Sequence, residues 1–250
     1  MTERKDIYFV SDVHLGLGTK DPAEREERFL SFLKAIPVES TRALYLLGDI
    51  WDFWYEYRDV VPKEGSRVVA RLILLMDQGV EVWFTPGNHD IWTFSYFESL
   101  GMRRFDQPYF CTIEGKRFCL GHGDLLGGAK PGYALMIKSF RCRFLQRLFS
   151  SLHPWIAYRI GLGWSNSSRR SHKPYKFRGA DEPLYRFAAE TESRRELDYF
   201  VFGHFHDAVD LSLPGGARLF VLKDWMDGGW NYGKFDGTTF SLHSTTSQFL

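Results

Sequence analysis

The sequence of 250 residues predicts an α/β fold built from layered sheets and helices, and three observations support it. Short apolar segments typical of buried strands alternate with amphipathic segments typical of helices, which favours βαβ units. A polar cluster directly follows five of the apolar segments. Apolar residues make up 44% of the chain, enough for the core of one large domain, or of one domain with an insertion.

The first half of the chain alternates three strands with two helices. Residues 7–10 form a short apolar run that predicts a buried strand, and residues 43–47 and 80–84 repeat this pattern. Between the first two strands, residues 23–36 place large apolar side chains among charges at helical spacing, and a proline ends the segment. Residues 67–76 predict a second, more apolar helix that ends near a glycine.

The second half contributes two more strands of this kind and a tail of short strands. Residues 118–120 and 199–202 are apolar, and both run directly into a glycine and a histidine. Residues 218–240 predict short strands joined by glycine-rich turns. Because strand ends gather at one edge of a layered α/β sheet, we expect the five polar clusters to meet in one place.

Charge and cysteine content exclude several classes of protein. The formal net charge is +1, so bulk charge does not make the chain a polyanion binder. No signal peptide is visible, and no uncharged apolar stretch reaches the roughly 20 residues of a membrane span. Three cysteines without a CxxC spacing argue against a disulfide framework and predict a reducing cytoplasm: Cys111, Cys119 and Cys142.

The five polar clusters share the chemistry of metal ligands. Five of the eight histidines fall in them, which random placement explains poorly, although one such motif alone is usually structural. The candidate donors are oxygens and imidazoles, a set that suits manganese, iron or zinc and disfavours a structural zinc site of the cysteine type. They are Asp12, His14, Asp49, Asn88, His122, His204 and His206.

Seven ligands are too many for one tetrahedral ion. They suit two divalent ions, about 3.5–4 Å apart, that share a bridging carboxylate. Such a pair lowers the pKa of a water molecule and holds phosphoryl oxygens during in-line attack. We therefore expect two-metal hydrolysis of a phosphoester.

The clusters resemble the five-motif signature of the calcineurin-like metallophosphoesterases. In this chain the motifs read DVH, GDIWD, GNHD, GHGD and GHFH, and they span residues 12–206. The resemblance implies a four-layer αββα sandwich, a dimetal site at one sheet edge and water as the nucleophile. It also implies a division of ligands, in which Asp49 bridges the ions, one ion has Asp12, His14 and His206, and the other has Asn88, His122 and His204.

Three further polar residues lie inside the motifs but outside this ligand set. His89 is predicted to be catalytic, because beside the phosphate it can donate to a non-bridging oxygen or protonate the leaving group. Asp90 either orients His89 or is a turn or cap residue. Asp52 either supports a metal ligand or caps a helix.

The segment between the fourth and fifth motifs differs from the rest of the chain in charge. Residues 125–180 contain eleven Lys or Arg and no Asp or Glu. We therefore divide the chain into a core, residues 1–124 and 181–250, and a basic helical cap insertion, residues 125–180. An apolar i, i+4 stripe predicts one amphipathic helix that stops near Pro154; it consists of Met136, Phe140, Phe144, Leu148 and Leu152.

Three interpretations of this cap stay open. Its apolar stripe packs on the sheet while its charges meet water, or it forms a basic groove for nucleic acid. In the third interpretation the cap faces a membrane and takes acyl chains and anionic head groups. We favour the membrane-facing cap, with no nucleic acid and no protein partner.

The chain is also similar to the UDP-2,3-diacylglucosamine diphosphatases of Gram-negative lipid A biosynthesis. The shared segments are FVSDVHLG, GDIWDFWYE, GHGDLLG and VLKDW, together with a basic helical insertion of this size. The resemblance implies a manganese enzyme that hydrolyses the pyrophosphate of this lipid-linked UDP-sugar to UMP and 2,3-diacylglucosamine 1-phosphate. It also implies a cytoplasmic protein bound peripherally to the anionic surface of the inner membrane.

One position departs from that family, whose best-known branch has arginine in GNRD where this chain has His89. The chain is then either a divergent branch of the same enzyme or a phosphodiesterase or phosphatase acting on a soluble nucleotide or another phosphoester. A non-catalytic scaffold would lose metal ligands, and this chain keeps every one. As phosphate-binding candidates in the cap we nominate Arg169, Arg170 and Lys173.

Overall fold

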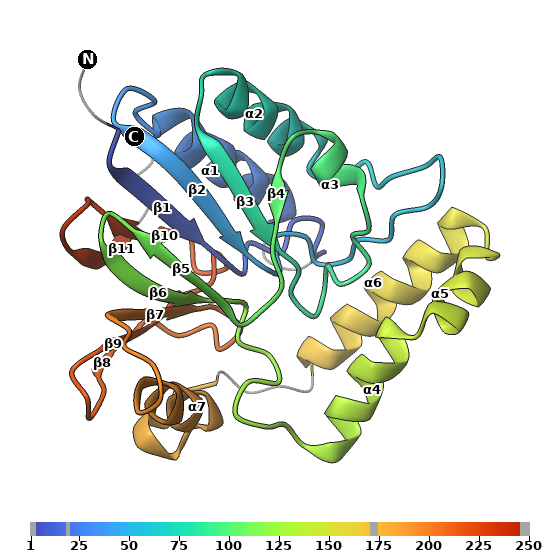
Figure 1. The fold of residues 1–250 in the computed structure, drawn as a ribbon. Helices are drawn as coiled ribbons and strands as arrows, with labels where there is room; N and C mark the ends of the chain where they lie inside the picture. The colour runs from blue at the N-terminus through green and yellow to red at the C-terminus, as the bar shows by residue number, and fades with distance from the viewer. Residues whose placement is uncertain (1–3, 19–20, 171–174, 246–250) are drawn as a thin grey trace.

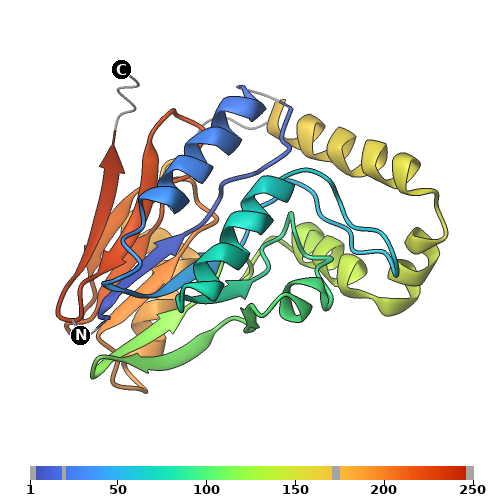
Figure 2. The same ribbon diagram turned by 90° about the horizontal axis from the view of Figure 1, so that it is seen from above.

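Two β-sheets face each other at the centre of the molecule, with helices on their outer faces (Figure 1). The structure is a computed structural model that describes residues 4–18, 21–170 and 175–245. Seen from above, the sheets and the helices form successive layers (Figure 2). The layered α/β fold predicted from the sequence is confirmed.

The first sheet has six strands in the order β11-β10-β1-β2-β3-β4. Strands β1 to β4 run parallel, and β10 and β11 extend the sheet in antiparallel pairing. The three strands predicted in the first half of the chain correspond to β1, β2 and β3, which lie at the centre of this sheet. The bounds are β1 Asp6–Val10, β2 Thr41–Leu47, β3 Glu81–Thr85, β4 Arg103–Arg104, β10 Trp230–Phe235 and β11 Phe240–Thr245.

The second sheet has five strands in the order β5-β6-β7-β9-β8. Strands β6, β7 and β9 run parallel, while β5 and β8 pair antiparallel at the two edges. The predicted strands of the second half of the chain are β6 and β7. The bounds are β5 Tyr109–Ile113, β6 Lys116–Leu120, β7 Tyr199–Phe202, β8 Val209–Ser212 and β9 Arg218–Val221.

Helices cover both sheets because each one turns a stripe of apolar side chains inward. In α2 the buried residues include Val68, Leu72 and Leu75, which recur at helical spacing. Figure 1 shows α1 and α2 over the first sheet and α7 over the second. The bounds are α1 Pro22–Ala35, α2 Ser66–Asp77, α3 Tyr96–Ser99, the 3-10 helix η1 Gly179–Asp181 and α7 Pro183–Glu192.

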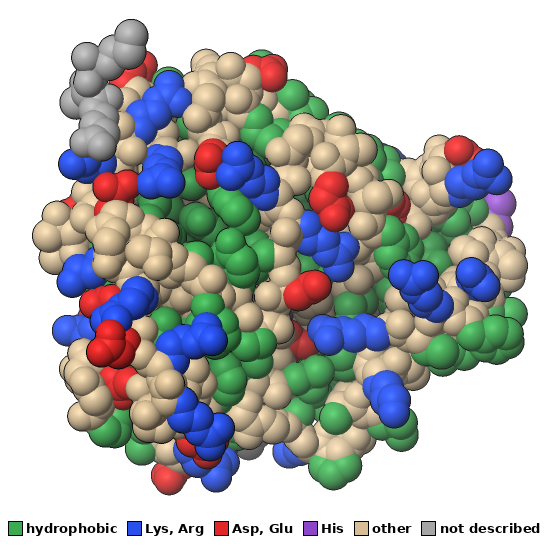
Figure 3. Space-filling model, viewed as in Figure 1, with side chains coloured by type: hydrophobic (Ala, Val, Ile, Leu, Met, Phe, Trp, Pro, Cys, Tyr) green, Lys and Arg blue, Asp and Glu red, His purple; other side chains and the backbone are tan. Residues whose placement is uncertain are grey.

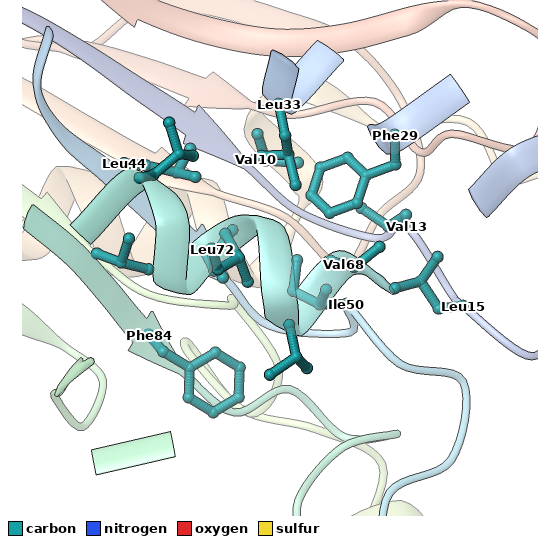
Figure 4. Close-up of a cluster of buried hydrophobic side chains, with 14 of the residues drawn as sticks. Val10, Val13, Leu15, Phe29, Leu33, Leu44, Ile50, Val68, Leu72 and Phe84 are labelled. Carbon is teal, nitrogen blue, oxygen red and sulfur yellow. The ribbon is translucent and has the colours of Figure 1, made fainter. Parts of the chain in front are cut away.

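The apolar core has three layers because strand side chains alternate between the two faces of a sheet. In β1, Tyr8 and Val10 pack toward α1 and α2, in the cluster that Figure 4 shows, whereas Ile7 and Phe9 point toward the second sheet. A third cluster joins the second sheet to Leu184 and neighbouring residues of α7. This packing fixes both sheets and therefore the edge at which their strands end.

The cap differs from the single helix predicted from its apolar stripe. The stripe is divided between two helices, because Cys142 is extended, with φ −70° and ψ 114°. The carbonyl oxygen of Phe140, which a continuous helix would bond to the amide of Phe144, instead accepts from Trp92 Nε1 at 2.9 Å and Gln146 Nε2 at 2.8 Å. The bounds are α4 Pro131–Arg141, α5 Arg143–Ser150 and α6 Pro154–Arg170.

The stripe ends near Pro154, as predicted, because α5 stops at Ser150, and Pro154 itself begins the next helix, α6. Proline is favoured in the first turn of a helix, where its missing amide proton has no helical partner to lose. Within the described residues, no helix is both long enough and apolar enough to cross a membrane. Figure 1 shows α4, α5 and α6 beside the two sheets rather than over either outer face.

Candidate dimetal site

The seven predicted metal ligands lie together where five strands end. Strands β1, β2, β3, β6 and β7 each end within three residues of one of the polar clusters. The backbone turns sharply at these points, because five ligands are non-glycine residues in the left-handed region, a conformation that costs free energy and recurs at functional sites. They are Asp12 (φ 54°), His14 (φ 52°), Asp49 (φ 54°), His204 (φ 72°) and His206 (φ 56°).

One group of donors forms around Asp12. Its Oδ1 atom lies 3.4 Å from His206 Nε2 and 3.7 Å from His14 Nε2. The rings of His14 and His206 are stacked, with centroids 5.1 Å apart. Three potential ligand atoms therefore face one point, and all lie within 4.8 Å of one another.

A second group forms around Asn88. Its side-chain oxygen lies 3.2 Å from His122 Nε2 and 3.0 Å from His204 Nδ1. His122 is fully buried, and its Nδ1 contacts the carbonyl oxygen of Leu47 at 2.9 Å, which leaves Nε2 directed at Asn88. An amide oxygen and two imidazoles are again donors suited to a transition-metal ion.

Asp49 lies between the two groups. Its Oδ2 atom is 3.3 Å from His122 Nε2 and 4.0 Å from His14 Nε2, while Oδ1 accepts from the backbone amide of His89 at 2.8 Å. The carboxylate fits because residue 87 is glycine: a Cβ atom on Gly87 would lie 2.2 Å from Asp49 Oδ1. The position matches that of a carboxylate shared by two metal ions.

Neighbouring histidines keep two buried carboxylates of the cluster, Asp12 and Asp49, ionised. Burial alone would raise the pKa of Asp49, but His122 and His89 hold it well below its usual range. Asp12 behaves in the same way, since His206 and His14 outweigh its burial and lower its pKa. Burial and the neighbouring His122 lower the pKa of His204 to about 4, so this imidazole is neutral, the form that binds metal.

The donor set fits two divalent metal ions. Asp12 Oδ1 is buried and accepts no hydrogen bond from the described part of the chain, which is costly for a carboxylate oxygen unless a cation faces it. Potential ligand atoms meet within 4.8 Å in three overlapping groups, the other two being His14 with Asp49 and His89, and Asp12 with Asp49 and His122. The groups share Asp12, His14 and Asp49, an overlap that is compatible with two neighbouring ions.

Two acidic residues orient these histidines from behind. Asp224 Oδ2 lies 2.8 Å from His206 Nδ1, and Asp52 Oδ1 lies 3.2 Å from His14 Nδ1. A carboxylate on Nδ1 fixes the ring and directs Nε2 toward a metal ion. Of the two roles considered for Asp52, the structure therefore favours support of a ligand. Asp224 is a residue that our sequence analysis missed, although the VLKDW segment that contains it was noted.

His89 and Asp90 have separate roles. His89 lies at the mouth of the site, with its side chain 15% exposed and its ring edge-on to His14. Its Nδ1 contacts the carbonyl oxygen of Asp52 at 3.0 Å.

Asp90 accepts from the backbone amides of Gly87 at 2.7 Å and Ile50 at 2.9 Å, so it joins two ligand loops as a turn residue. Burial, with a smaller effect of Asp49, raises the pKa of Asp90 to about 7.

The cap brings Tyr133 to the site, and our sequence analysis missed this residue. The Tyr133 ring lies 6.3 Å from the ring of His204, and its hydroxyl is buried with no hydrogen bond to the described residues. Burial, and then Asp124, raises the pKa of Tyr133, so the hydroxyl keeps its proton. A tyrosine at helix spacing carried no signal in the sequence, because only the seating of α4 turns it toward the histidines.

The basic candidates of the cap are not placed at the site. Arg169 and Arg170 belong to the last turn of α6, and their side chains lie outside the described part of the chain. Lys173 lies wholly outside the described residues. A phosphate-binding role for the three residues stays a prediction.

The chain belongs to the calcineurin-like phosphoesterase family, whose model matches residues 5–208. It is therefore a metal-dependent phosphoester hydrolase, and the family implies two divalent ions. The more specific resemblance is also confirmed. The chain is 36% identical over 258 residues to a UDP-2,3-diacylglucosamine hydrolase of Porphyromonas gingivalis, covering 96% of this chain and 98% of that protein.

Other relatives agree with this placement. The UDP-2,3-diacylglucosamine hydrolase of Stenotrophomonas maltophilia is 31% identical, over 88% of this chain and 91% of that protein. Among solved structures, an archaeal phosphodiesterase matches with a TM-score of 0.50 and 10% identity, covering 96% of this chain and 99% of that one. At that identity the structural likeness supports the fold alone.

Proposed function

We propose that this protein hydrolyses the pyrophosphate of UDP-2,3-diacylglucosamine, releasing UMP and 2,3-diacylglucosamine 1-phosphate. Water adds to the α-phosphorus, and the bond from that phosphorus to the bridging oxygen breaks. Relatives that span nearly the whole chain are named for this substrate. The observation that carries the proposal is the meeting of seven metal-type donors from five strand ends, beside a cap with an exposed apolar surface.

The proposed ligand division follows the two groups of donors. In this division Asp12, His14 and His206 hold one ion and Asp49 bridges both, a role supported by its contacts with His122 and His14. Manganese is the proposed ion, with iron and zinc as alternatives. Two bound ions would supply a water of lowered pKa and neutralise charge on the phosphoryl oxygens. The second ion would be held by Asn88, His122 and His204.

His89 is proposed to act directly on the phosphate. Its Nδ1 faces the carbonyl oxygen of Asp52, so the imidazolium form directs its second N–H away from that loop. A donor there stabilises the charge that develops on a phosphoryl oxygen, and it can protonate the leaving phosphate. Tyr133, on the cap side, is placed to donate a further hydrogen bond from its protonated hydroxyl.

The cap is proposed to hold the lipid part of the substrate against an anionic membrane surface. Several large apolar side chains of α4, α5 and α6 are exposed, and Figure 3 shows hydrophobic and basic side chains side by side over α4 and α5. An apolar surface among Lys and Arg is what an anionic bilayer attracts. The most exposed are Leu135, Phe144, Leu148, Trp155 and Ile160.

The test is UMP release from UDP-2,3-diacylglucosamine in mixed micelles by the manganese-loaded protein. We expect turnover that stops on chelation with EDTA. In ¹⁸O-labelled water the label enters UMP if attack is at the α-phosphorus, and the sugar phosphate if it is at the β-phosphorus. Hydrolysis of a soluble diester such as bis(p-nitrophenyl) phosphate, with no UMP release from the lipid, would overturn the substrate and make His89 the mark of a different one.

A further inference from the structure

A buried hydroxyl joins the cap to the metal-binding loops. Ser165 of α6 is 1% exposed, and its Oγ donates to Asp52 Oδ2 at 2.7 Å. The same face of α6 carries two small residues, Gly161 one turn earlier and Ala157 two turns earlier. A Cβ atom on Gly161 would lie 2.2 Å from the ring of Phe53, so the helix rests directly on the loop that follows Asp49.

Asp52 contacts two histidines of the site as well as the cap. Its Oδ1 atom lies 3.2 Å from His14 Nδ1, and its backbone carbonyl oxygen lies 3.0 Å from His89 Nδ1. One carboxylate therefore has one oxygen on the cap helix and the other on a candidate metal ligand. A rotation of this carboxylate would release both contacts together.

We propose that Ser165 is a positioning residue, which holds the Asp52 carboxylate that orients His14. The affinity of the site for metal then depends on how α6 of the cap packs against the loop that carries Asp52. The donor bond from Ser165 fixes Oδ2, and Oδ1 then faces His14 Nδ1. With Nδ1–H donating to the carboxylate, Nε2 carries the lone pair that a metal ion needs.

The coupling has a second consequence, because free-energy coupling between two sites is reciprocal. If seating of α6 strengthens binding of an ion at His14, then binding of that ion strengthens the seating of α6 by the same factor. The cap would close most firmly over a fully metallated site. Among the described residues, no hydrogen bond of this kind links α6 to Asn88, His122 or His204, so binding of an ion proposed to lie there should be affected little.

The test is calorimetric titration of manganese into metal-depleted protein, with no substrate present, so its result does not depend on the proposed substrate. Removing the outer hydrogen-bond partner of a metal ligand, here Asp52, weakens metal binding by about 10- to 100-fold, and loss of Ser165, which acts through Asp52, should approach the lower end of that range. We expect Ser165→Ala to weaken one of two binding steps by about 10-fold, and Ser165→Thr, which keeps a hydroxyl, to restore most of it. Ser139→Ala is the matched control, since Ser139 of α4 donates only to its own helix in the described contacts, to Met136 O at 2.7 Å.

A double-mutant cycle separates this relay from general loosening of the cap. In an Asp52→Asn background, Ser165→Ala should weaken manganese binding by much less than in the native background. In hydrogen-exchange measurements, manganese should also slow the exchange of the α6 amides in the native protein, but not in Ser165→Ala. Unchanged affinity in Ser165→Ala, an equal loss in Ser139→Ala, or the same loss with and without Asp52 would each overturn the proposal.

Discussion

The strand-end loops and the cap differ in how they expose their characteristic side chains. In the loops the polar groups are buried: Asp49 is 1% exposed and His122 is fully buried. In the cap the apolar groups are exposed: Phe144 is 73% exposed and Leu148 is 61% exposed. Each region inverts the usual arrangement, and a buried charge or an exposed apolar patch is a sign of function.

The difference matches the two tasks that the proposed reaction sets. The loops hold a buried set of donors, while the cap presents an exposed apolar surface, which our proposal assigns to the lipid part of the substrate. They are joined by aromatic side chains from the ligand loops themselves. Tyr55 Oη donates to Gln146 O at 2.6 Å, and Trp92 Nε1 donates to Phe140 O at 2.9 Å. The loops that carry Asp49 and Asn88 thus also hold the cap.

The largest effect is expected in the loops. Asp49→Ala should remove the carboxylate that we propose both ions share, lowering kcat/KM by about three orders of magnitude or more and reducing bound manganese. Activity is measured by UMP release and metal by elemental analysis. Asp77→Ala, at the exposed end of α2, is the control and should change neither. Full activity in Asp49→Ala would refute the assignment of the bridge.

His89→Ala should have the next largest effect and leave metal content intact. Loss of a proton donor at the phosphate lowers kcat by about 100-fold. His89→Arg supplies another cationic donor at the same position and should retain more activity than the alanine variant. If both variants lose manganese, His89 is a ligand, as its grouping with His14 and Asp49 would permit, and the catalytic role is wrong.

The sequence predicted the loops well because each ligand follows a short apolar strand. Strand ends of a layered fold must meet at an edge, so Asp12 and His206, far apart in the chain, were placed together without a structure. The residues that contact the predicted ligands from behind are harder to recognise in the sequence. Asp224 follows a strand that carries no histidine, and only the fold shows that it contacts His206 at 2.8 Å.

The cap was predicted less well, because an i, i+4 stripe is a local signal and the break at Cys142 has a tertiary cause. Trp92 and Gln146 satisfy the Phe140 carbonyl oxygen, and the helix can end there. In addition, only part of the apolar stripe packs against the rest of the protein. Phe140 packs on Trp92 and Trp164, whereas Phe144 is exposed. Packing on the sheet is therefore not the explanation for that half of the stripe.

The cap's exposed apolar surface should matter only for acylated substrate. Phe144→Ser with Leu148→Ser should lower activity on the lipid substrate, and binding to vesicles containing anionic phospholipid, by about 10-fold, since two side chains that are partly buried in lipid contribute about 0.7 kcal/mol each. Hydrolysis of a small soluble diester should be unchanged.

Leu74→Ser is the control for that double variant, because Leu74 is 52% exposed on α2, a core helix. It should bind vesicles like the native protein. Equal losses on the lipid and the soluble diester in the cap variant would instead indicate misfolding of the cap. Vesicle binding equal to that of the native protein would remove the membrane-facing role.

A smaller effect is expected where the two regions join. Trp92→Phe keeps the aromatic packing on Phe140 and Phe149 but removes the indole N–H. One hydrogen bond contributes about 1 kcal/mol, so amides near the start of α5 should exchange about fivefold faster in hydrogen exchange. Trp83→Phe, which loses a bond to Glu81 within a core strand, should leave cap exchange unchanged. Unaltered exchange in Trp92→Phe would break the link between loop and cap.

The smallest effect is expected where the chain returns from the cap to α7. Burial alone would raise the pKa of Glu182, but hydrogen bonds from Arg178 and Tyr175 lower it below its usual value. A lowered folded-state pKa stabilises the protein above the unfolded value of about 4.5 and loses that stabilisation as the pH falls. Glu182→Gln should therefore reduce the free energy of unfolding by about 0.5 kcal/mol at pH 7 and by less at pH 3.5, in denaturant titrations. A difference that is the same at both pH values would mean that the Glu182 charge contributes nothing, and that other contacts of the return segment, such as Phe177 on Phe205, hold it in place.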